Sequence, residues 1–426
     1  MGLKRYKLGD LIEVTRGQSL AGEFYAEEGK YIRLTLGNFD YANGGFKPNT
    51  TKTNLYYTGP IKEQFILEEG DIITPLTEQT PGLLGSTARI PVSGTYIQSQ
   101  DVALVRCKDG MLDPAFCYYL LPSSSVKKQL AAGAQQTKIR HTSPDKIKDV
   151  VVDIPDISEQ RRIGQLLDAI THKIELNRSI NQNLEALAKQ LYDYWFVQFD
   201  FPDEQGKPYK SSGGKMVWNE KLKREIPDGW EAVSVNDISD SYRGVSYAKD
   251  DLVDEQHGLL VLRGNNIQNS QLVFDSNVAY IPESFVSDEQ KIRKGHIVMT
   301  MSSGSKEHVG KCVLFHHEPN ETYGAFLTKF VPHAFCSNLL YNVFNSDYFK
   351  SIIKSTASGT GINNLTNQTF DNIFIAMPPM ELLQKYDALQ DQLFGEVGNL
   401  QQNTWNLIKQ RDELLPFLMN GQVTLE

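Results

Sequence analysis

The segment from Gly304 to Cys312 is the closest approach to a catalytic motif in this sequence. A phosphate-binding loop has four residues between its glycines and a Ser or Thr after its lysine, because that hydroxyl holds the magnesium ion. Here five residues separate Gly304 from Gly310, and Cys312 stands where the hydroxyl should be. The segment therefore does not predict a nucleotide-hydrolysing site.

Two other arrangements that could carry chemistry are also incomplete. Residues 377–380 contain the double proline of amino-methyltransferases, but they lack the preceding Asn or Asp and the following aromatic residue that hold and stack a flipped base. His316 and His317 adjoin each other without a third ligand at metal-binding spacing. We therefore expect no catalytic residue and no metal site, and a protein that recognises a target while a partner performs the chemistry.

Cysteine spacing and composition narrow the class of protein. The four cysteines lie far apart without a C-x-x-C pair, which favours simple thiols over a zinc site or a disulfide framework. No stretch reaches the roughly 18 apolar residues of a membrane helix, and the N-terminus lacks the apolar run of a signal peptide. We expect a cytoplasmic protein with no membrane partner. The net charge of −9 argues against a stand-alone nucleic-acid binder, although residues 127–148 are locally basic.

A set of short landmarks occurs twice, about 225 residues apart, which indicates duplicated domains rather than short solenoid repeats. Arg16-Gly17 returns as Arg243-Gly244, and residues 69–73 return as residues 294–298. Short apolar runs bounded by Gly, Pro, Asn and Asp predict strands in both copies. Each copy ends in an aliphatic strand and a proline, before a long helical stretch.

Heptad patterns mark both of these long stretches. In the first, one seam position holds Ile163, Ile170, Asn177, Leu184 and Leu191, and the other holds Leu167, Ile174, Asn181, Ala188 and Trp195. In the second, the repeating residues are Tyr386, Leu393, Leu400, Leu407 and Leu414. An apolar stripe needs a partner, and an antiparallel pairing of the two helices is favoured over packing of each helix on its own domain.

These patterns predict an α+β fold with two repeated α/β domains and two long antiparallel coiled-coil helices. We expect the first domain at residues 1–155, a central helical region at 156–200, a linker at 201–228, the second domain at 229–378 and a C-terminal helical region at 379–426. The linker is predicted because Pro and Gly recur through it.

The order of these parts resembles the specificity subunit of Type I restriction–modification systems. Residues 226–231 look like the family's entry into a target recognition domain, residues 154–163 look like the start of its conserved helix, and residues 193–201 resemble the end of its central helical region. The first domain lacks the Pro-x-Gly-Trp opening, and residues 381–384 depart from the expected Glu-Gln-Arg run. The resemblance covers essentially the whole chain.

The resemblance implies a DNA-binding subunit that selects a split double-stranded target, with one half-site for each recognition domain. It implies that the paired helices fix the gap between the half-sites and dock methyltransferase subunits, which carry S-adenosylmethionine and methylate adenine N6. A restriction/translocase subunit is a further expected partner. No cofactor is expected on this chain itself, and the specificity subunits have no catalytic residues.

Candidate DNA-binding residues come from polar segments that recur at equivalent places, since Arg, Asn and Gln are the side chains that suit base edges. In the first half they are Arg16, Arg33, Thr77, Gln79, Thr80, Lys138, Arg140 and His141. In the second half they are Arg243, Arg263, Asn265, Asn266, Ser302, Ser303, Lys306, His308, Asn363 and Asn364. A duplicated coiled-coil adaptor without DNA specificity is the alternative, which the acidic balance favours mildly.

Overall fold

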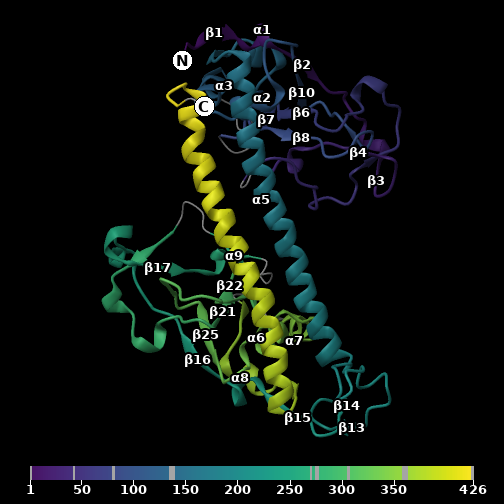
Figure 1. The fold of residues 1–426 in the computed structure, drawn as a ribbon, viewed down its shortest axis with the longest axis vertical. Coiled ribbons are helices and arrows are strands. Elements are labelled where there is room, and N and C mark those ends of the chain that lie inside the picture. The colour runs from purple at the N-terminus through teal and green to yellow at the C-terminus, as the bar shows by residue number, and fades with distance from the viewer. Residues whose placement is uncertain are drawn as a thin grey trace. The chain divides into compact units, whose positions relative to one another are not determined.

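The computed structural model describes residues 2–41, 44–78, 82–133, 140–268, 271–273, 278–304, 308–356 and 363–423. The chain forms two compact units, and both long helices contribute to each of them (Figure 1). Unit 1 contains Met1–Leu176 and Thr404–Glu426, and unit 2 contains Asn177–Asn403. In the described part of the chain, no helix combines the length and the apolar character needed to cross a membrane.

Unit 1 is built on a four-stranded antiparallel sheet in the order β2-β10-β6-β8. These strands are β2 (Ile12–Arg16), β6 (Ile72–Pro75), β8 (Ala88–Arg89) and β10 (Val102–Cys107). A smaller sheet holds β3 (Tyr25–Ala26), β5 (Tyr56–Tyr57), β4 (Tyr31–Arg33) and β9 (Tyr96–Ile97). The remaining strands are β1 (Lys4–Lys7), β7 (Thr77–Glu78), β11 (Arg140–His141) and β12 (Val151–Ile154).

Short helices cover the core of unit 1: α1 (Leu8–Leu11), α2 (Pro114–Leu120), α3 (Ser124–Gly133) and α4 (Pro144–Lys148). Helix α2 begins at Pro114, where the missing N–H costs nothing, and Asp113 Oδ1 accepts a hydrogen bond from the backbone N of Phe116 at 3.1 Å. This cap directs Phe116 and Cys117 into the core, where both are fully buried.

Unit 2 repeats this plan with a sheet in the order β16-β25-β21-β23. These strands are β16 (Ser239–Arg243), β21 (Ile297–Thr300), β23 (Cys312–Leu314) and β25 (Leu327–Pro332). The other strands are β13 (Met216–Asn219), β14 (Arg224–Pro227), β15 (Glu231–Ser234), β17 (Leu259–Leu262), β18 (Ile267–Gln268), β19 (Gln271–Leu272), β20 (Tyr280–Ile281), β22 (Ser302–Ser303), β24 (Glu321–Tyr323), β26 (Asn363–Asn364) and β27 (Phe374–Met377). Its short helices are α6 (Ser337–Asn345), α7 (Asp347–Thr356) and α8 (Asn367–Asp371). The matching strand order confirms the predicted duplication.

The long helices are α5 (Ile157–Tyr192), which continues into a π-helical turn at Asp193–Val197, and α9 (Met380–Met419). Within unit 1, Ile163 near the start of α5 shares a core cluster with Leu418 at the end of α9. Within unit 2, Gln390 Nε2 in the first half of α9 donates to the carbonyl of Ala188 near the end of α5, at 2.9 Å. The two helices therefore run antiparallel, as the heptads predicted (Figure 1).

Polar residues interrupt this seam, as expected. Asn177 and Asn181 are buried, and Asn177 Nδ2 and Asn181 Oδ1 have no hydrogen-bond partner in the described structure. Gln390 is fully buried, and it bonds both Ala188 and the hydroxyl of Tyr386. Such groups cost stability but favour one register, because a shifted pairing would leave more of them unsatisfied.

Residues 201–228, where a linker was expected, form an ordered part of unit 2. Strands β13 and β14 pair as an antiparallel hairpin, with Met216 opposite Pro227. Phe201 stacks on Tyr209 at 4.7 Å and on Trp230 at 5.2 Å between ring centroids. These aromatic contacts anchor a segment whose Pro and Gly residues predicted a linker. The compact units also divide inside α5 and α9, whereas the sequence placed boundaries at the helix ends.

Candidate nucleic-acid interface

Two separate segments that the sequence singled out in the first repeat lie side by side in unit 1. Strands β7 and β11 pair antiparallel, with Thr77 opposite His141 and Glu78 opposite Arg140. The backbone N of Thr142 extends this pairing by donating to the carbonyl of Leu76 at 2.9 Å. The result is a short two-stranded ribbon that brings Thr77, Arg140 and His141 together.

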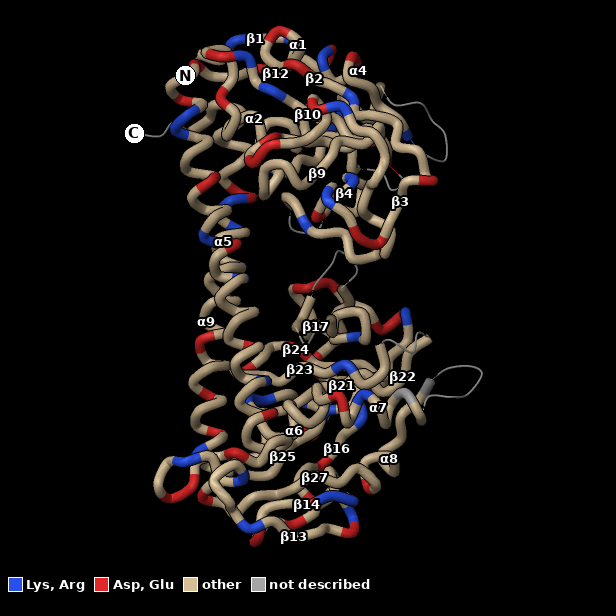
Figure 2. Tube along the Cα trace, turned by 90° about the vertical axis from the view of Figure 1, so that its right-hand side faces the viewer, with Lys and Arg blue, Asp and Glu red and all other residues tan. Residues whose placement is uncertain are grey.

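Unit 2 contains the equivalent ribbon at the equivalent place. Strands β22 and β26 pair antiparallel, with Ser302 opposite Asn364 and Ser303 opposite Asn363. Here Leu365 N donates to the carbonyl of Met301 at 2.8 Å. Figure 2 shows β22 at the margin of unit 2, beyond β21 of the main sheet. The two ribbons share a backbone but differ in every paired side chain.

A buried carboxylate supports the ribbon of unit 1. The Glu78 side chain is almost fully buried, and its Oε2 accepts hydrogen bonds from the backbone N of Leu83 and Leu84 at 2.8 and 3.0 Å. Its Oε1 lies 3.7 Å from Arg140 Nη1. Burial, assisted by the Glu78 charge, raises the pKa of Tyr41 to about 12. A buried charge requires such partners, and Arg140 supplies an ion-pair partner for Glu78 without a hydrogen bond to it. From the sequence we selected Thr77 and not Glu78, because the sequence does not show that the Glu78 side chain is buried.

The repeated Arg-Gly pair has a structural cause in each unit. A Cβ atom on Gly17 would lie 2.3 Å from the carbonyl oxygen of Ser99, and one on Gly244 would lie 2.2 Å from that of Gly324. Only glycine permits this approach of two backbones. The neighbouring arginines reach over the same loops, where Arg16 Nε donates to Gln100 O at 2.8 Å and Arg243 Nε donates to Ala325 O at 3.0 Å. Both arginine side chains remain exposed.

Two candidate residues instead lie inside their units. Arg33 is 7% exposed, donates to the Asn54 carbonyl at 3.1 Å and lies over the Tyr25 ring at 3.8 Å. Asn266 is 3% exposed, and its Nδ2 donates to the carbonyl of Val273 at 3.0 Å. These hydrogen bonds occupy both side chains within the fold, so we leave both residues out of the proposed DNA-contact set.

The remaining candidates differ in what the structure says of them. Asn265 is exposed, Arg263 is partly buried, and His308 Nδ1 lies 3.3 Å from Lys311 Nζ. Outside the described residues lie Gln79, Thr80, Lys138 and Lys306, and the side chain of Asn363 is not described.

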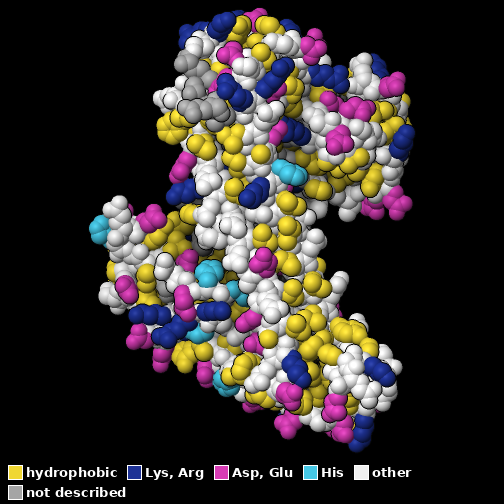
Figure 3. Space-filling model, viewed as in Figure 1, with side chains coloured by type: hydrophobic (Ala, Val, Ile, Leu, Met, Phe, Trp, Pro, Cys, Tyr) yellow, Lys and Arg dark blue, Asp and Glu magenta, His cyan; other side chains and the backbone are white. Residues whose placement is uncertain are grey.

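A second surface lies on α5 and its π-helical turn, away from the buried seam. Ile180, Leu187 and Tyr194 recur every seven residues and are exposed, Leu187 by 49%, and Val197 continues the line one turn later. We call these four residues the outer stripe. Figure 3 shows apolar side chains in a line along this helix. Apolar residues at heptad spacing on an exposed helix face are typical of a site for a partner helix. This seven-residue spacing is present in the sequence, but we interpreted only the more regular heptad pattern of the buried seam.

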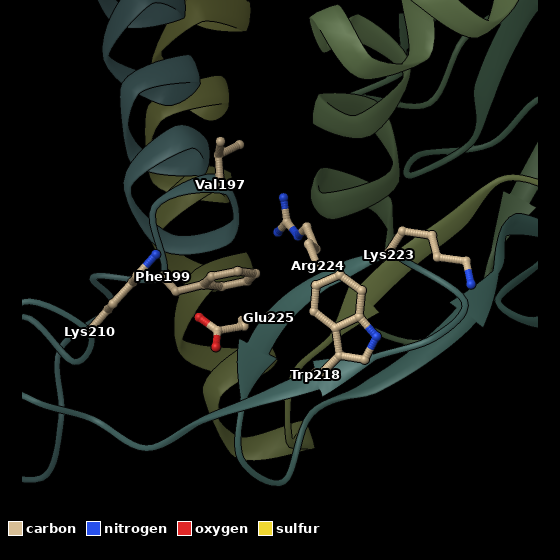
Figure 4. Close-up of a pocket in the computed structure, with 7 residues that line it drawn as sticks. All are labelled: Val197, Phe199, Lys210, Trp218, Lys223, Arg224 and Glu225. Atoms are coloured by element: carbon tan, nitrogen blue, oxygen red, sulfur yellow. The ribbon is translucent and has the colours of Figure 1, made fainter.

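A shallow cavity of about 440 Å³ adjoins the outer stripe at Val197 (Figure 4). It is lined by Val197, Phe199, Lys210, Trp218, Lys223, Arg224 and Glu225. Arg224 Nη2 donates to the carbonyl of Phe196 at 2.9 Å, its guanidinium lies 4.5 Å from the centre of the Phe199 ring, and burial lowers its pKa. Trp218 is 59% exposed on the hairpin. The hairpin thus extends the apolar surface of the helix and adds cationic groups to it.

Comparison with known proteins finds a family model and several relatives that match parts of this chain. Residues 2–186 match the model of the Type I restriction modification DNA specificity domain. The StySPI specificity subunit of Salmonella potsdam is 31% identical over 208 residues, which is 47% of this chain and 44% of that subunit, so the match spans less than half of the relative's length. The MjaIX specificity subunit of Methanocaldococcus jannaschii is 26% identical over 75% of this chain and 71% of its own length.

A solved structure extends the likeness of fold to almost the whole chain. The Type I restriction–modification S subunit from M. genitalium superposes with a TM-score of 0.60 at 17% sequence identity, covering 98% of this chain and 96% of that chain. The duplicated sheets, the antiparallel helices and the matched domain agree with one another. Residues 2–186 thus carry the DNA specificity domain of Type I restriction–modification systems, and the chain as a whole is similar in fold to a specificity subunit of these systems.

Proposed function

We propose that this protein is the DNA-specificity subunit of a Type I restriction–modification complex and that each unit recognises one half of a split target. The observation that carries the proposal is the pair of ribbons, which have one backbone arrangement and different side chains. Arg140 and His141 supply hydrogen-bond donors in unit 1, and Ser302 and Asn364 supply shorter polar groups in unit 2. Two different half-sites require such a difference, because base edges are distinguished by their donors and acceptors.

Contacts to the DNA backbone fall to exposed cations beside the ribbons. Arg16 and Arg243 occupy equivalent positions, each held through Nε on a neighbouring loop. An arginine oriented in this way suits a phosphate, which positions the protein without adding sequence information. The two arginines therefore give both units the same phosphate contact, whereas the ribbons give them different contacts to the bases.

The antiparallel helices set the spacing between the two half-sites in this proposal. Helix α5 contains 36 residues, which gives a length of about 54 Å at the usual rise. Half-sites on one face of B-DNA lie about 34 Å apart for each helical turn. A paired helix of this length is the right scale for a spacer, and its buried polar residues favour a single register.

The outer stripe is the proposed docking site for methyltransferase subunits, which bring S-adenosylmethionine and the catalytic residues. The specificity subunit then needs no cofactor or catalytic group of its own, and it works in the cytoplasm where the DNA lies. A restriction/translocase subunit would join the same assembly. Exposed apolar residues at heptad spacing support helix docking, because a partner helix would cover them.

A salt titration of the complex with its methyltransferase subunit tests DNA binding. We expect Arg140→Ala and Lys138→Ala to weaken binding and to lower the slope of log affinity against log salt, because each removes a positive charge from the proposed DNA-binding segments. Lys4→Ala, an exposed cation on β1, is the matched control and should leave the slope unchanged. Unchanged slopes for the first two variants would remove them from the interface. A wild-type complex without sequence-selective binding would contradict the proposed function and favour the adaptor role.

A further inference from the structure

Phe326 has the greatest exposure of any large apolar side chain in the described part of the chain, at 66%. It lies directly before β25, one of the two central strands of the unit 2 sheet. An exposed phenylalanine does not contribute the free energy that burial of its side chain would add to folding. Isolated exposed apolar residues are common, so the position of this one decides whether it has a role.

The backbone around Phe326 joins two parts of the proposed DNA-binding surface. Its carbonyl accepts hydrogen bonds from the backbone N of Met301 at 3.0 Å and of Ser302 at 3.3 Å. The preceding carbonyl, of Ala325, accepts from Arg243 Nε at 3.0 Å. Phe326 is therefore fixed between the exposed arginine and the first strand of the ribbon.

The equivalent position in unit 1 is Asp101. In the two sheets, Ala103 lies opposite Arg16 and Thr328 lies opposite Arg243, so Ala103 and Thr328 are equivalent. Asp101 and Phe326 each lie two residues before these strand positions. The hydrogen bonds agree, since Asp101 O accepts from Leu76 N at 2.9 Å as Phe326 O accepts from Met301 N. The backbone is conserved between the repeats while the side chain changes from a carboxylate to a phenyl ring.

We propose that this position determines specificity and that Phe326 packs against the 5-methyl group of a thymine in the half-site of unit 2. This inference rests on the proposed function. A phenyl ring has no donor for a phosphate, and the thymine methyl is the apolar group that base pairs present in the major groove. A carboxylate at the same place in unit 1 would accept from a cytosine amino group instead. The two repeats thus use one backbone position for opposite chemistries.

Deoxyuridine substitution tests this contact, because it removes the methyl group and leaves base pairing intact. The split target is first obtained by mapping methylated adenines, and each thymine is then replaced in turn in DNA bound by the complex with its methyltransferase subunit. We expect one thymine, in one half-site, whose replacement weakens wild-type binding about three- to fivefold, the effect of burying one methyl group. Phe326→Ala should bind the thymine and deoxyuridine forms of that site equally.

Asp101→Ala is the matched control and should keep the wild-type sensitivity at that thymine, because it alters the other unit. Phe326→Leu, which keeps an apolar side chain, should retain part of the sensitivity. Equal responses of wild type and Phe326→Ala at every thymine would overturn the inference while selective binding persists. A target with no thymine in either half-site would overturn it as well. Loss of selective binding by the wild-type complex itself would overturn the proposed function instead.

Discussion

His316 gives unit 2 a pH dependence that can be worked out from its surroundings. Its ring stacks on Phe394 of α9, with centroids 4.6 Å apart and planes 17° apart. Burial lowers the pKa of His316 to about 4, and the charge of Asp391 opposes this shift only in part. The folded protein therefore holds the ring neutral at pH values where an unfolded chain would protonate it.

The direction of the effect follows from that difference. An unfolded histidine has a pKa of about 6.5, so the stabilising contribution is fully present above that value and is lost as the pH falls towards 4. For a folded pKa of about 4, linkage gives a loss of about 2 kcal/mol at pH 5. Protonation of His316, whose ring stacks on Phe394, thus weakens the packing of the unit 2 sheet region against α9.

The measurement compares wild type with His316→Phe, which retains stacking and removes titration. Urea unfolding followed by tryptophan fluorescence reports on unit 2, because Trp195 and Trp230 lie in its core cluster. Between neutral pH and about pH 5, the wild type should lose about 2 kcal/mol more than the variant. His296, whose pKa burial also lowers to about 4, is common to both proteins and cancels. His317→Phe, at the exposed neighbouring position, should keep most of the wild-type pH dependence, because the His317 charge is a smaller cause of the shift than burial. Identical pH dependence of wild type and His316→Phe would refute the reasoning.

Three further perturbations test other parts of the account. Gly244→Ala should destabilise the protein by roughly 1–3 kcal/mol in thermal unfolding, whereas Gly304→Ala, where an added Cβ meets nothing within 4 Å, should be neutral; equal melting temperatures would show that the close approach is relaxed in solution. Leu187→Glu in the outer stripe should weaken copurification with the methyltransferase subunit roughly tenfold or more, and Phe285→Glu, an exposed site elsewhere in unit 2, should not; retention by both variants would place the docking site elsewhere. One extra heptad in both α5 and α9 adds about 10.5 Å to each helix and should lengthen the gap in the methylated target by about three base pairs, so an unchanged gap would contradict the spacer role.

Periodic features were predictable from the sequence because their signal is local and repeated. The heptads located both long helices, and the duplicated landmarks predicted two repeated domains. Equivalence between repeats also selected the ribbon segments, although their pairing with each other emerged only in the structure. A two-residue strand such as β7 or β22 has too few residues for a pattern, so its partner depends on the surrounding fold.

Features that depend on residues distant in the sequence were missed, because they leave no local pattern. The 201–228 segment contains turn-forming residues, yet it is anchored because Phe201 stacks on both Tyr209 and Trp230. Arg33 and Asn266 have the side chains that bind bases, but Asn54 and Val273 satisfy them within the fold. Polarity identifies what a side chain can bond, whereas burial decides which partner it meets.

Mapping of N6-methyladenine in DNA from cells that contain this chain and the proposed methyltransferase subunit tests the central claim most directly. The account predicts a target with two short specified halves separated by a fixed unspecified gap. Substitution of the unit 2 ribbon residues Ser302 and Asn364 should change one half of the target sequence. The other half and the gap should stay the same. A single continuous motif, or simultaneous change of both halves, would contradict recognition of separate half-sites by the two units.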